Sequence, residues 1–569
     1  MDRAAKLLIV LWACVALAGH TMLGRTWPGM APTVAAIFGA SAGLVAFDRR
    51  FVAPVLALTY VVPALVRLLL GAWDTQYYPL WTAALLGAIV PDGLRRGWHL
   101  PVRWRGPLIA GALSVATSTT IVVARELDFN LALLGVMPEA VLSGLPVFFA
   151  AWTTYVGLTL VVGLLWFDWL IGAREFDLTR WVVAPLGVSL GALAVASLFQ
   201  LTYDITFLNE TVYAGIGRAG GTVYDANVAG TLAAAGVGGA LFGASRYKGW
   251  PSVAFGLFAL VLWAAVWASG SRTAFAAAAI VTATGAWSFG RPGALLPSGR
   301  AWVFAAAVVS IVVVLGASRF AAVGPLGRVW ATLPGWSVTS MRAFGAEMWN
   351  RNGYGAASTR LIERFPVTGI GVGSFHVFGP RLAGMDLPPD NAQNWYRHQL
   401  VELGLLGAAG WLVFAALFGW MVVKPPPGLP APVWCVRGIL LAFGAISWLG
   451  VPTQELPASV TFWTAAAWYA SLCGVTAGSS ALGVWRWGGI GVVVLAFGIS
   501  TVHAATTTLR VPVRARAVGW PFSYGFYGPE PDLEGGEHRW AQRRATALVD
   551  ASGRVLSLAV RVNHHDVVE

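Results

Sequence analysis

Residues 182–199 read VVAPLGVSLGALAVASLF, a stretch without a single charged side chain. A helix over these residues would be about 27 Å long, close to the thickness of the hydrocarbon core of a membrane. Apolar runs of similar length recur along nearly the whole chain. The sequence therefore predicts a protein built from many membrane-spanning helices.

Composition supports this interpretation. The chain has 569 residues, of which 57% are hydrophobic and only 11% are charged, and its mean hydropathy is +0.67. So few charges do not cover the surface of a soluble protein of this size. Transmembrane barrels are excluded because their strands alternate and are about half as long as these runs. We expect an all-α polytopic membrane protein of about fifteen transmembrane helices, with centres near Cys14, Phe38, Tyr60, Leu85, Ser114, Gly157, Leu190, Ala235, Leu260, Ile280, Val309, Val413, Ala442, Ala466 and Val494.

The first apolar run follows Arg3 and Lys6 in the manner of a signal peptide, but no convincing cleavage site follows it, so we interpret it as a retained helix. The three cysteines, Cys14, Cys435 and Cys473, lie inside apolar runs and predict neither disulfides nor a thiolate metal site. The net charge of +12 is distributed among loops. No compact basic domain exists outside the membrane, so no nucleic-acid partner is predicted.

Basic residues separate the loops into two sets. Lys and Arg collect on the cytoplasmic side of membrane helices, so the rich set indicates a cytoplasmic N-terminus. The large loop and the C-terminal tail then lie on the outer side of the membrane. The cytoplasmic set comprises Arg49, Arg50, Arg95, Arg96, Arg103, Arg105, Arg174, Arg180, Arg246, Lys248, Arg291, Arg300 and Lys424, and the short outer loops hold only Arg25, Arg125 and Arg218.

These spans divide the chain into four parts. Residues 1–318 would hold helices 1 to 11, residues 319–402 a large outer loop with the candidate active site, and residues 403–504 helices 12 to 15. Residues 505–569 would form an outer tail, in which Thr546 to Val562 reads as two strands joined at Ser552-Gly553.

Two arginines near the outer ends of spans are exceptions to the preference of Lys and Arg for the cytoplasmic side. Arg272, in Ser271-Arg272-Thr273, begins a span between small residues, which favours a functional role. Arg67 lies inside a span, where an arginine either has a partner or ligand or extends its charged end to the interface. In the outer loop from Leu201, Gly220-Gly221 permits a tight backbone path, and Asn227 is either a helix cap or a ligand contact.

The large loop carries most of the remaining polar residues. Arg360 and Arg364 share a helix face, which either faces a ligand or rests on phospholipid head groups. Gly369, Gly371 and Gly373 resemble a nucleotide loop, but no soluble strand and helix surround them, so a turn is expected instead. His376, between aromatic residues, is predicted to be a packed histidine.

Further polar residues collect before the hydrophobic run that starts near Leu403. They are Gln393, Asn394, Arg397, His398 and Glu402. With a helix start near Asn391, Asn394 and His398 would share a face, as would His398 and Glu402. A carboxylate beside an imidazole can orient it and raise its basicity; the alternative is an ordinary polar helix start. No metal-site pattern and no cofactor motif is present on this side.

Taken in order, these motifs resemble the O-antigen ligase and O-antigen polymerase superfamily of bacterial membrane glycosyltransferases. The resemblance covers roughly Arg180 to Gly410. It rests on Arg218 to Asn227 with Ala226 where proline is usual, on Ser271-Arg272-Thr273, on Arg351 followed by Pro366, Gly369, Gly371 and Phe375, and on Gln393-Asn394 followed by Glu402 and Gly404. The family histidine falls on Gln393, which cannot act as a general base, and His398 is the nearest substitute.

The resemblance implies a bacterial inner-membrane protein whose large loop and C-terminal tail are periplasmic. It also implies transfer of a glycan from an undecaprenyl-diphosphate carrier to a hydroxyl of a glycan, lipid or protein acceptor at the periplasmic face, without a metal. Arginines then have to stabilise the leaving diphosphate, and their forked donors suit that task. Arg272 and Arg351 are the first candidates. His398 with Glu402, or Gln393 with Asn394, would activate the acceptor, and the substrate-binding candidates are Arg218, Asn227, Asn394, Arg397, Arg360, Arg364 and Arg67.

Two other functions are compatible with a polytopic chain. A transporter or flippase of a lipid-linked saccharide would show internal repeats and broken helices with polar residues near the midplane. The polar residues collect instead at one face, and no repeat is evident. A structural scaffold would not need so many arginines in one outer region. The sequence favours the enzyme over both the transporter and the scaffold, and membrane lipids are its expected surroundings. It does not distinguish a ligase from a polymerase.

Overall fold

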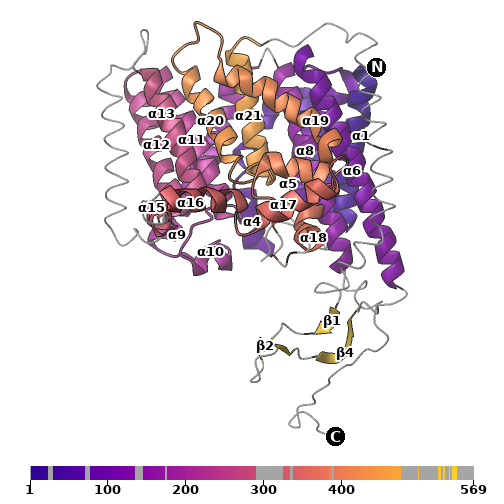
Figure 1. The fold of residues 1–569 in the computed structure, drawn as a ribbon. Coiled ribbons are helices and arrows are strands. Elements are labelled where there is room, and N and C mark those ends of the chain that lie inside the picture. The colour runs from indigo at the N-terminus through magenta and orange to yellow at the C-terminus, as the bar shows by residue number, and fades with distance from the viewer. Residues whose placement is uncertain are drawn as a thin grey trace.

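The structure, a computed structural model, is a bundle of helices (Figure 1). It describes residues 2–23, 30–70, 77–134, 145–173, 176–289, 324–332, 338–383, 385, 387, 390–475 and 498, together with short pieces of the tail at 523–526, 530–531, 537–538 and 541–547. Within this part of the chain, eight helices are long and apolar enough to cross a membrane, or nine if one bent pair is a single span. The prediction of a polytopic helical protein is confirmed.

The first group of helices comes from the N-terminal part of the chain. These are α1 (Asp2–Leu23), α2 (Met30–Phe47), the short η1 (Arg49–Phe51), α3 (Val52–Ala57), α4 (Val62–Leu70), α5 (Tyr77–Arg95), α6 (Val102–Leu134), α8 (Leu145–Gly172), the π-helical η3 (Thr179–Val183) and α9 (Ala184–Thr202). Residues 49–57 and 62–69 form the bent pair, at 56°.

The second half adds the remaining long helices and a group of shorter ones at one end of the bundle. The long helices are α11 (Ala226–Arg246), α12 (Trp250–Ala268), α13 (Arg272–Phe289), α19 (Trp395–Val423), α20 (Val433–Ile446) and α21 (Leu456–Leu472). The shorter ones, which lie together at the lower end in Figure 1, are α10 (Thr211–Gly215), α15 (Pro325–Thr332), α16 (Val338–Asn350), α17 (Tyr354–Arg364) and α18 (Ser374–Leu382).

Most of the predicted span centres fall in these helices. Those at Val309 and Val494 lie outside the described residues, so the total of about fifteen stays a prediction. The hydrophobic span predicted to start near Leu403 is part of α19, which begins at Trp395, a few residues after the helix start predicted near Asn391. The predicted domain boundary at 402–403 therefore falls inside this helix. In the tail, β1 (Ser523–Phe526) pairs with β4 (Ala541–Ala547) and β2 (Glu530–Pro531) with β3 (Glu537–His538), both antiparallel. The second strand of the predicted hairpin lies outside the described residues.

Small residues bring the helices close together, as is usual where lipid surrounds a bundle. A side chain added at Gly410 of α19 would lie 2.5 Å from the backbone nitrogen of Gly111 on α6. On the outside of the bundle, large apolar side chains such as Val188, Val195 and Leu69 are exposed. Exposed apolar surface of this kind marks a face that contacts another apolar phase.

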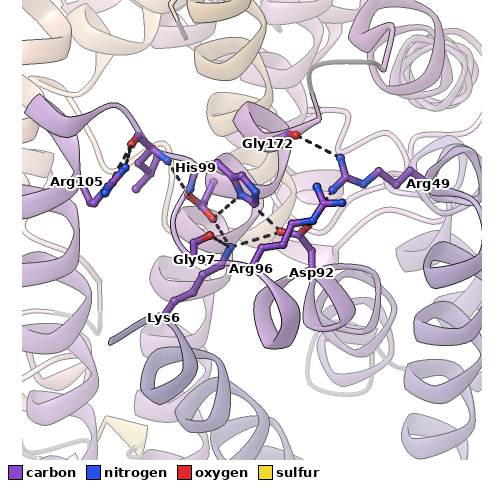
Figure 2. A network of polar contacts seen from close by, with 10 residues as sticks. Lys6, Arg49, Asp92, Arg96, Gly97, His99, Arg105 and Gly172 are labelled. Atoms are coloured by element: carbon purple, nitrogen blue, oxygen red, sulfur yellow. Dashed lines mark hydrogen bonds and ion pairs between the residues drawn. The ribbon is translucent and has the colours of Figure 1, made fainter. Parts of the chain in front are cut away.

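The end of the bundle opposite the short helices is held by buried charges (Figure 2). Lys6 of α1 lies 2.7 Å from the carboxylate of Asp168 and 3.5 Å from that of Asp92. Arg49 reaches Asp92 at 2.8 Å, and the backbone N–H of His99 donates to Asp168 at 2.8 Å. These contacts join α1, α5 and α8 with η1 and the segment around His99. We call this end of the molecule the basic end.

Candidate functional site

Arg218 is placed by two loops at the end of the bundle that carries the short helices. Its Nε donates to the carbonyl oxygen of Ser269 at 2.8 Å, and its Nη2 donates to Oδ1 of Asn227 at 2.6 Å. The guanidinium lies over the ring of Tyr213, 5.2 Å from its centre. The Tyr213 hydroxyl donates to Asp225 at 2.6 Å. Arg218 is thereby held in one orientation before any ligand binds.

Asp225, rather than Asn227, caps the following helix. The Asp225 carboxylate accepts hydrogen bonds from the backbone N–H groups of Asn227 and Val228 at the start of α11. The capping alternative for Asn227 is therefore wrong. Its side chain instead fixes Arg218, which keeps Asn227 at the candidate site as a positioning residue.

A fourth arginine, Arg328, joins the three that the sequence analysis singled out. Its Nη1 donates to the carbonyl oxygen of Gly270 at 3.0 Å, two residues before Arg272 at the start of α13. Burial and the charge of Arg272 lower the pKa of Arg328. Burial lowers the pKa of Arg218 as well, together with the charges of Arg328 and Arg272.

Arg351 approaches the same place from the end of α16. Burial and the charge of Arg272 lower its pKa too. Its Nη1 donates to the carbonyl oxygen of Leu449 at 2.7 Å and its Nη2 to Oε1 of Gln393 at 3.0 Å. We call Arg218, Arg272, Arg328 and Arg351 the arginine cluster. Arg272 is exposed and its charge acts on the other three, which makes this a place where an anion with several oxygens would be favoured.

A carboxylate that the sequence analysis did not select lies beside Arg351. The Gln393 side-chain amide donates to Oδ2 of Asp390, and the Asn391 backbone N–H donates to Oδ1 at 2.7 Å. Burial raises the pKa of Asp390, and the charge of Asp225 adds to this effect, while the charge of Arg351 opposes it. Asp390 therefore combines a raised pKa with a place next to the cluster, which is typical of a group that exchanges protons.

Gln393 connects the cluster to this carboxylate. It accepts from Arg351 and donates to Asp390, so one amide fixes both groups. Its backbone is left-handed, with φ of 53°, as is that of Arg351, with φ of 45°. Non-glycine residues seldom adopt this conformation, and such strain is often found at functional sites.

The other polar residues at the start of α19 hold the backbone. Asn394 is the N-cap, accepting from the Arg397 backbone N–H at 3.0 Å. The Arg397 guanidinium donates to the carbonyl oxygens of Ala392 and Trp349 and lies over the Trp349 ring. Asn394 and Arg397 are buried, so the assignment of both to substrate contact is replaced by one to loop geometry.

His398 and Glu402 do face each other, with 3.5 Å between Nε2 and Oε2. Both are almost fully buried, with 5% and 4% of their surface exposed. His398 accepts from the Ala392 backbone N–H, and Glu402 accepts from that of Phe375. An acceptor hydroxyl would have to reach into the protein to meet this pair, so we expect it to position the loop.

The glycine-rich segment closes a break in α19. At Gly404, with φ of 63°, the helix is interrupted, and residues 366–373 supply the missing hydrogen bonds. The Gly371 N–H donates to the Glu402 carbonyl oxygen at 2.8 Å, and the Leu405 N–H donates to that of Pro366 at 2.8 Å. A side chain at Gly369 would lie 2.5 Å from the Glu402 backbone. The predicted turn therefore fills the break in α19 and fixes the large loop on the bundle. We call residues 366–373 the plug.

Three further candidates lie on α4 and α17. Arg360 donates to the carbonyl oxygen of Ala383 at 3.1 Å, and Arg364 lies over the ring of Phe365. Both are exposed on α17, whose opposite face is buried. Arg67 is half-buried on α4. His376 lies against the ring of Trp152, 4.4 Å between centres, and burial lowers its pKa to about 4, as expected of a packed histidine.

Sequence reasoning missed Arg328 and Asp390 for different reasons. Arg328 lies on a short helix that directly follows a long apolar run, where no polar motif drew attention to it. Only the fold brings it to Gly270. Asp390 precedes the polar run that was selected, and the signal that could have found it is its place between a proline pair and Asn391. Among the described residues, no group of three or more His, Cys, Asp or Glu side chains could hold a metal ion.

Comparisons with protein-family models, with curated proteins and with solved structures find no match to this chain.

Proposed function

We propose that the chain is a membrane glycosyltransferase, similar to O-antigen ligases and polymerases, that moves a glycan from undecaprenyl diphosphate to an acceptor hydroxyl. The observation that carries the proposal is the arginine cluster, in which four guanidinium groups gather at one end of the bundle although they repel one another. The carboxylates of Asp225, Asp390 and Glu347 offset part of this repulsion, and a bound anion would offset more of it. A diphosphate presents several oxygens to forked donors.

In the proposed reaction, the acceptor hydroxyl gives its proton to the Asp390 carboxylate as its oxygen attacks the anomeric carbon. The bond from that carbon to the diphosphate oxygen breaks, and the lipid diphosphate leaves with the electron pair. Arg272 and Arg351 stabilise the charge that develops there, with Arg218 and Arg328 beside them. Gln393 orients Asp390 and Arg351 through its two hydrogen bonds. Asp390 thus takes the role in acceptor activation for which the sequence analysis named His398 with Glu402, or Gln393 with Asn394.

Transport of a lipid-linked saccharide is the second candidate, because the bundle does contain broken helices, at the bent pair and at Gly404 in α19. Transporters use such breaks to line a substrate path. The break at Gly404 is instead filled by residues 366–373, which favours the enzyme.

The test is glycan transfer from an undecaprenyl-diphosphate-linked donor in membranes, with Arg272→Lys and Arg351→Lys compared at matched expression. Lysine keeps the charge and loses the fork, so we expect transfer to fall on the order of a hundredfold in each variant. Arg364→Lys on α17 is the matched control and should retain activity. Full activity in both cluster variants would overturn the site assignment. A wild-type protein that flips the lipid-linked saccharide in vesicles and transfers it to no acceptor would favour transport.

A further inference from the structure

A second site of different character lies at the basic end of the bundle, away from the arginine cluster. It is a cavity of about 770 Å³ bounded by α9, α11, α12, α20 and α21. That volume is in the range of ligand-binding pockets. Its walls are almost entirely apolar, and Gly187 of α9 and Gly239 of α11 both line it. A side chain added at either glycine would meet nothing within 4 Å, so the space is open on both sides.

The cavity extends through only half of the bundle. Along η3 and α9 its lining runs from Arg180 to Gly191, a rise of roughly 16 Å at the rise per residue of an α-helix. The deep end is closed by Tyr60 and Thr461, whose hydroxyls are hydrogen-bonded to each other. Half of a hydrocarbon core is about 15 Å thick. The cavity is therefore as deep as one leaflet, which is the depth occupied by the acyl chain of a lipid.

The depth also separates this cavity from the proposed donor site. Arg218 is hydrogen-bonded to Asn227 in the first turn of α11, whereas the lining residues Gly243 and Tyr247 lie at the last turn of that helix. Arg272 begins α13 at the same end of the bundle as Arg218. A lipid whose diphosphate contacts the cluster has its head group at the other end of the bundle. A lipid with its head group at the rim of this cavity would therefore be a second molecule.

The rim of the cavity carries mostly positive charge. Arg180 lines it and is exposed, with its guanidinium over the ring of Trp181, 5.0 Å from the centre. Arg50 lies over the same ring at 5.4 Å. Arg246 and Lys248 flank the lining residue Tyr247, and all three are exposed. Among the described residues that line the cavity, Asp177 is the one acidic residue. This excess of positive charge complements an anionic head group.

The backbone beside the rim is unusual. Residues Thr179–Val183 form a π-helical turn at the start of α9, and Thr179, Arg180 and Val183 all line the cavity. Turns of this type inside helices are rare and are frequent at functional sites. Here the turn brings Arg180 to the rim of an apolar space, where its charge lies at the level of the lipid head groups.

We propose that this cavity binds one anionic glycerophospholipid from the leaflet at the basic end. One acyl chain fills the space between α9 and α11, and the phosphate lies at Arg180, with Arg246 and Lys248 adding longer-range attraction. The acyl chain of the lipid contributes to the binding free energy through burial of its methylene groups. The positive charges at the rim select the head group. The lipid would support the contact between α9 and α11, which the cavity otherwise leaves incomplete.

The test is native mass spectrometry of the full-length protein, extracted from vesicles of equal phosphatidylglycerol and phosphatidylcholine. We expect one retained phosphatidylglycerol in the wild type. Gly187→Leu and Gly239→Leu should each lower retention on the order of tenfold, because the leucine occupies the space of several methylene groups. Both substitutions are expected to fold, since neither new Cβ atom meets another atom.

Gly256→Leu on α12 is the matched control, because its added Cβ also meets nothing and it does not line the cavity; it should retain the lipid. Arg180→Gln should keep a lipid but lose the preference for phosphatidylglycerol. Retention in the two cavity variants equal to that in the wild type would overturn the site. Equal retention of both lipids by the wild type would overturn the anionic head group, and bound polyprenyl phosphate in place of either would overturn the proposed occupant.

Discussion

Asp390 is the residue on which the proposed chemistry depends most. Its carboxylate is half-buried, hydrogen-bonded by Asn391 and Gln393, and close enough to Arg351 for that charge to act on its pKa. The pair of His398 and Glu402 is the other candidate, but it is almost fully enclosed by protein. Access therefore decides the assignment in favour of Asp390.

Asp390→Asn removes the proton acceptor and keeps the shape of the side chain. We expect glycan transfer to fall by about a hundredfold or more, since general base catalysis contributes about that much. His398→Gln, which keeps a hydrogen-bonding group in the buried position, should lose much less when transfer is normalised to folded protein. Rates measured in membranes at saturating acceptor check both, and a stronger loss in His398→Gln than in Asp390→Asn would return the role of base to His398.

Gln393→Asn tests the orienting role of the amide through the pH profile. Asparagine tolerates the left-handed backbone at this position, but it is too short to keep both hydrogen bonds. The bond from Gln393 lowers the pKa of Asp390, so its loss raises that pKa further. Because the base works deprotonated, activity disappears as pH falls through the pKa. The acid limb of the rate profile should therefore move to higher pH in Gln393→Asn; an unchanged limb would separate Gln393 from Asp390.

At the scale of elements, the break in α19 shows how the large loop is attached. Gly404 has φ of 63° and ψ of −176°, a combination available essentially to glycine alone. A side chain there would also lie 2.3 Å from the Val367 carbonyl oxygen. Residues 366–373 and the first turns of α19 therefore form one unit that carries Asp390 and Gln393 to the cluster.

Gly404→Ala should disrupt this unit. The backbone strain alone costs about 1–3 kcal/mol, and the contact with Val367 adds to it, so we expect a clearly lower unfolding temperature in detergent and a loss of transfer. Gly419→Ala on the same helix is the control, because its added Cβ meets nothing within 4 Å. It should be neutral or slightly stabilising. Equal unfolding temperatures for the two variants would argue against the plug.

The elements also show what the sequence could and could not reveal. Length and hydropathy predicted the long helices, because crossing a membrane leaves a signal in the order of residues itself. Charge distribution placed Lys6, Arg49 and Arg96 together at one end, where the structure has them. The sequence did not reveal that Arg397 and Asn394 hold backbone, or that Arg328 joins the cluster, because these depend on contacts between segments far apart in the chain.

At the scale of the whole molecule, the buried charges in Figure 2 hold the basic end together. Lys6 and Asp168 have 1% and 0% of their side chains exposed. Removing one partner of such a pair leaves a buried charge, which typically costs about 3–5 kcal/mol. Lys6→Met should therefore lower the unfolding temperature strongly, whereas Lys6→Met with Asp168→Asn should recover part of the loss. Arg3→Met, at an exposed neighbouring contact, is the control, and an equal effect of Arg3→Met and Lys6→Met would argue against the network.

The two ends of the bundle also predict its orientation. Lys and Arg favour the cytoplasmic side, so the end with Lys248 should face the cytoplasm and the end with α17 the periplasm. Glu363 of α17 and Lys248 are both exposed. In a cysteine-free background, Glu363→Cys should react with a membrane-impermeant maleimide in intact cells. Lys248→Cys should react only after the cells are broken. The opposite pattern would place the arginine cluster in the cytoplasm, away from any periplasmic acceptor, and would remove the proposed reaction along with the orientation.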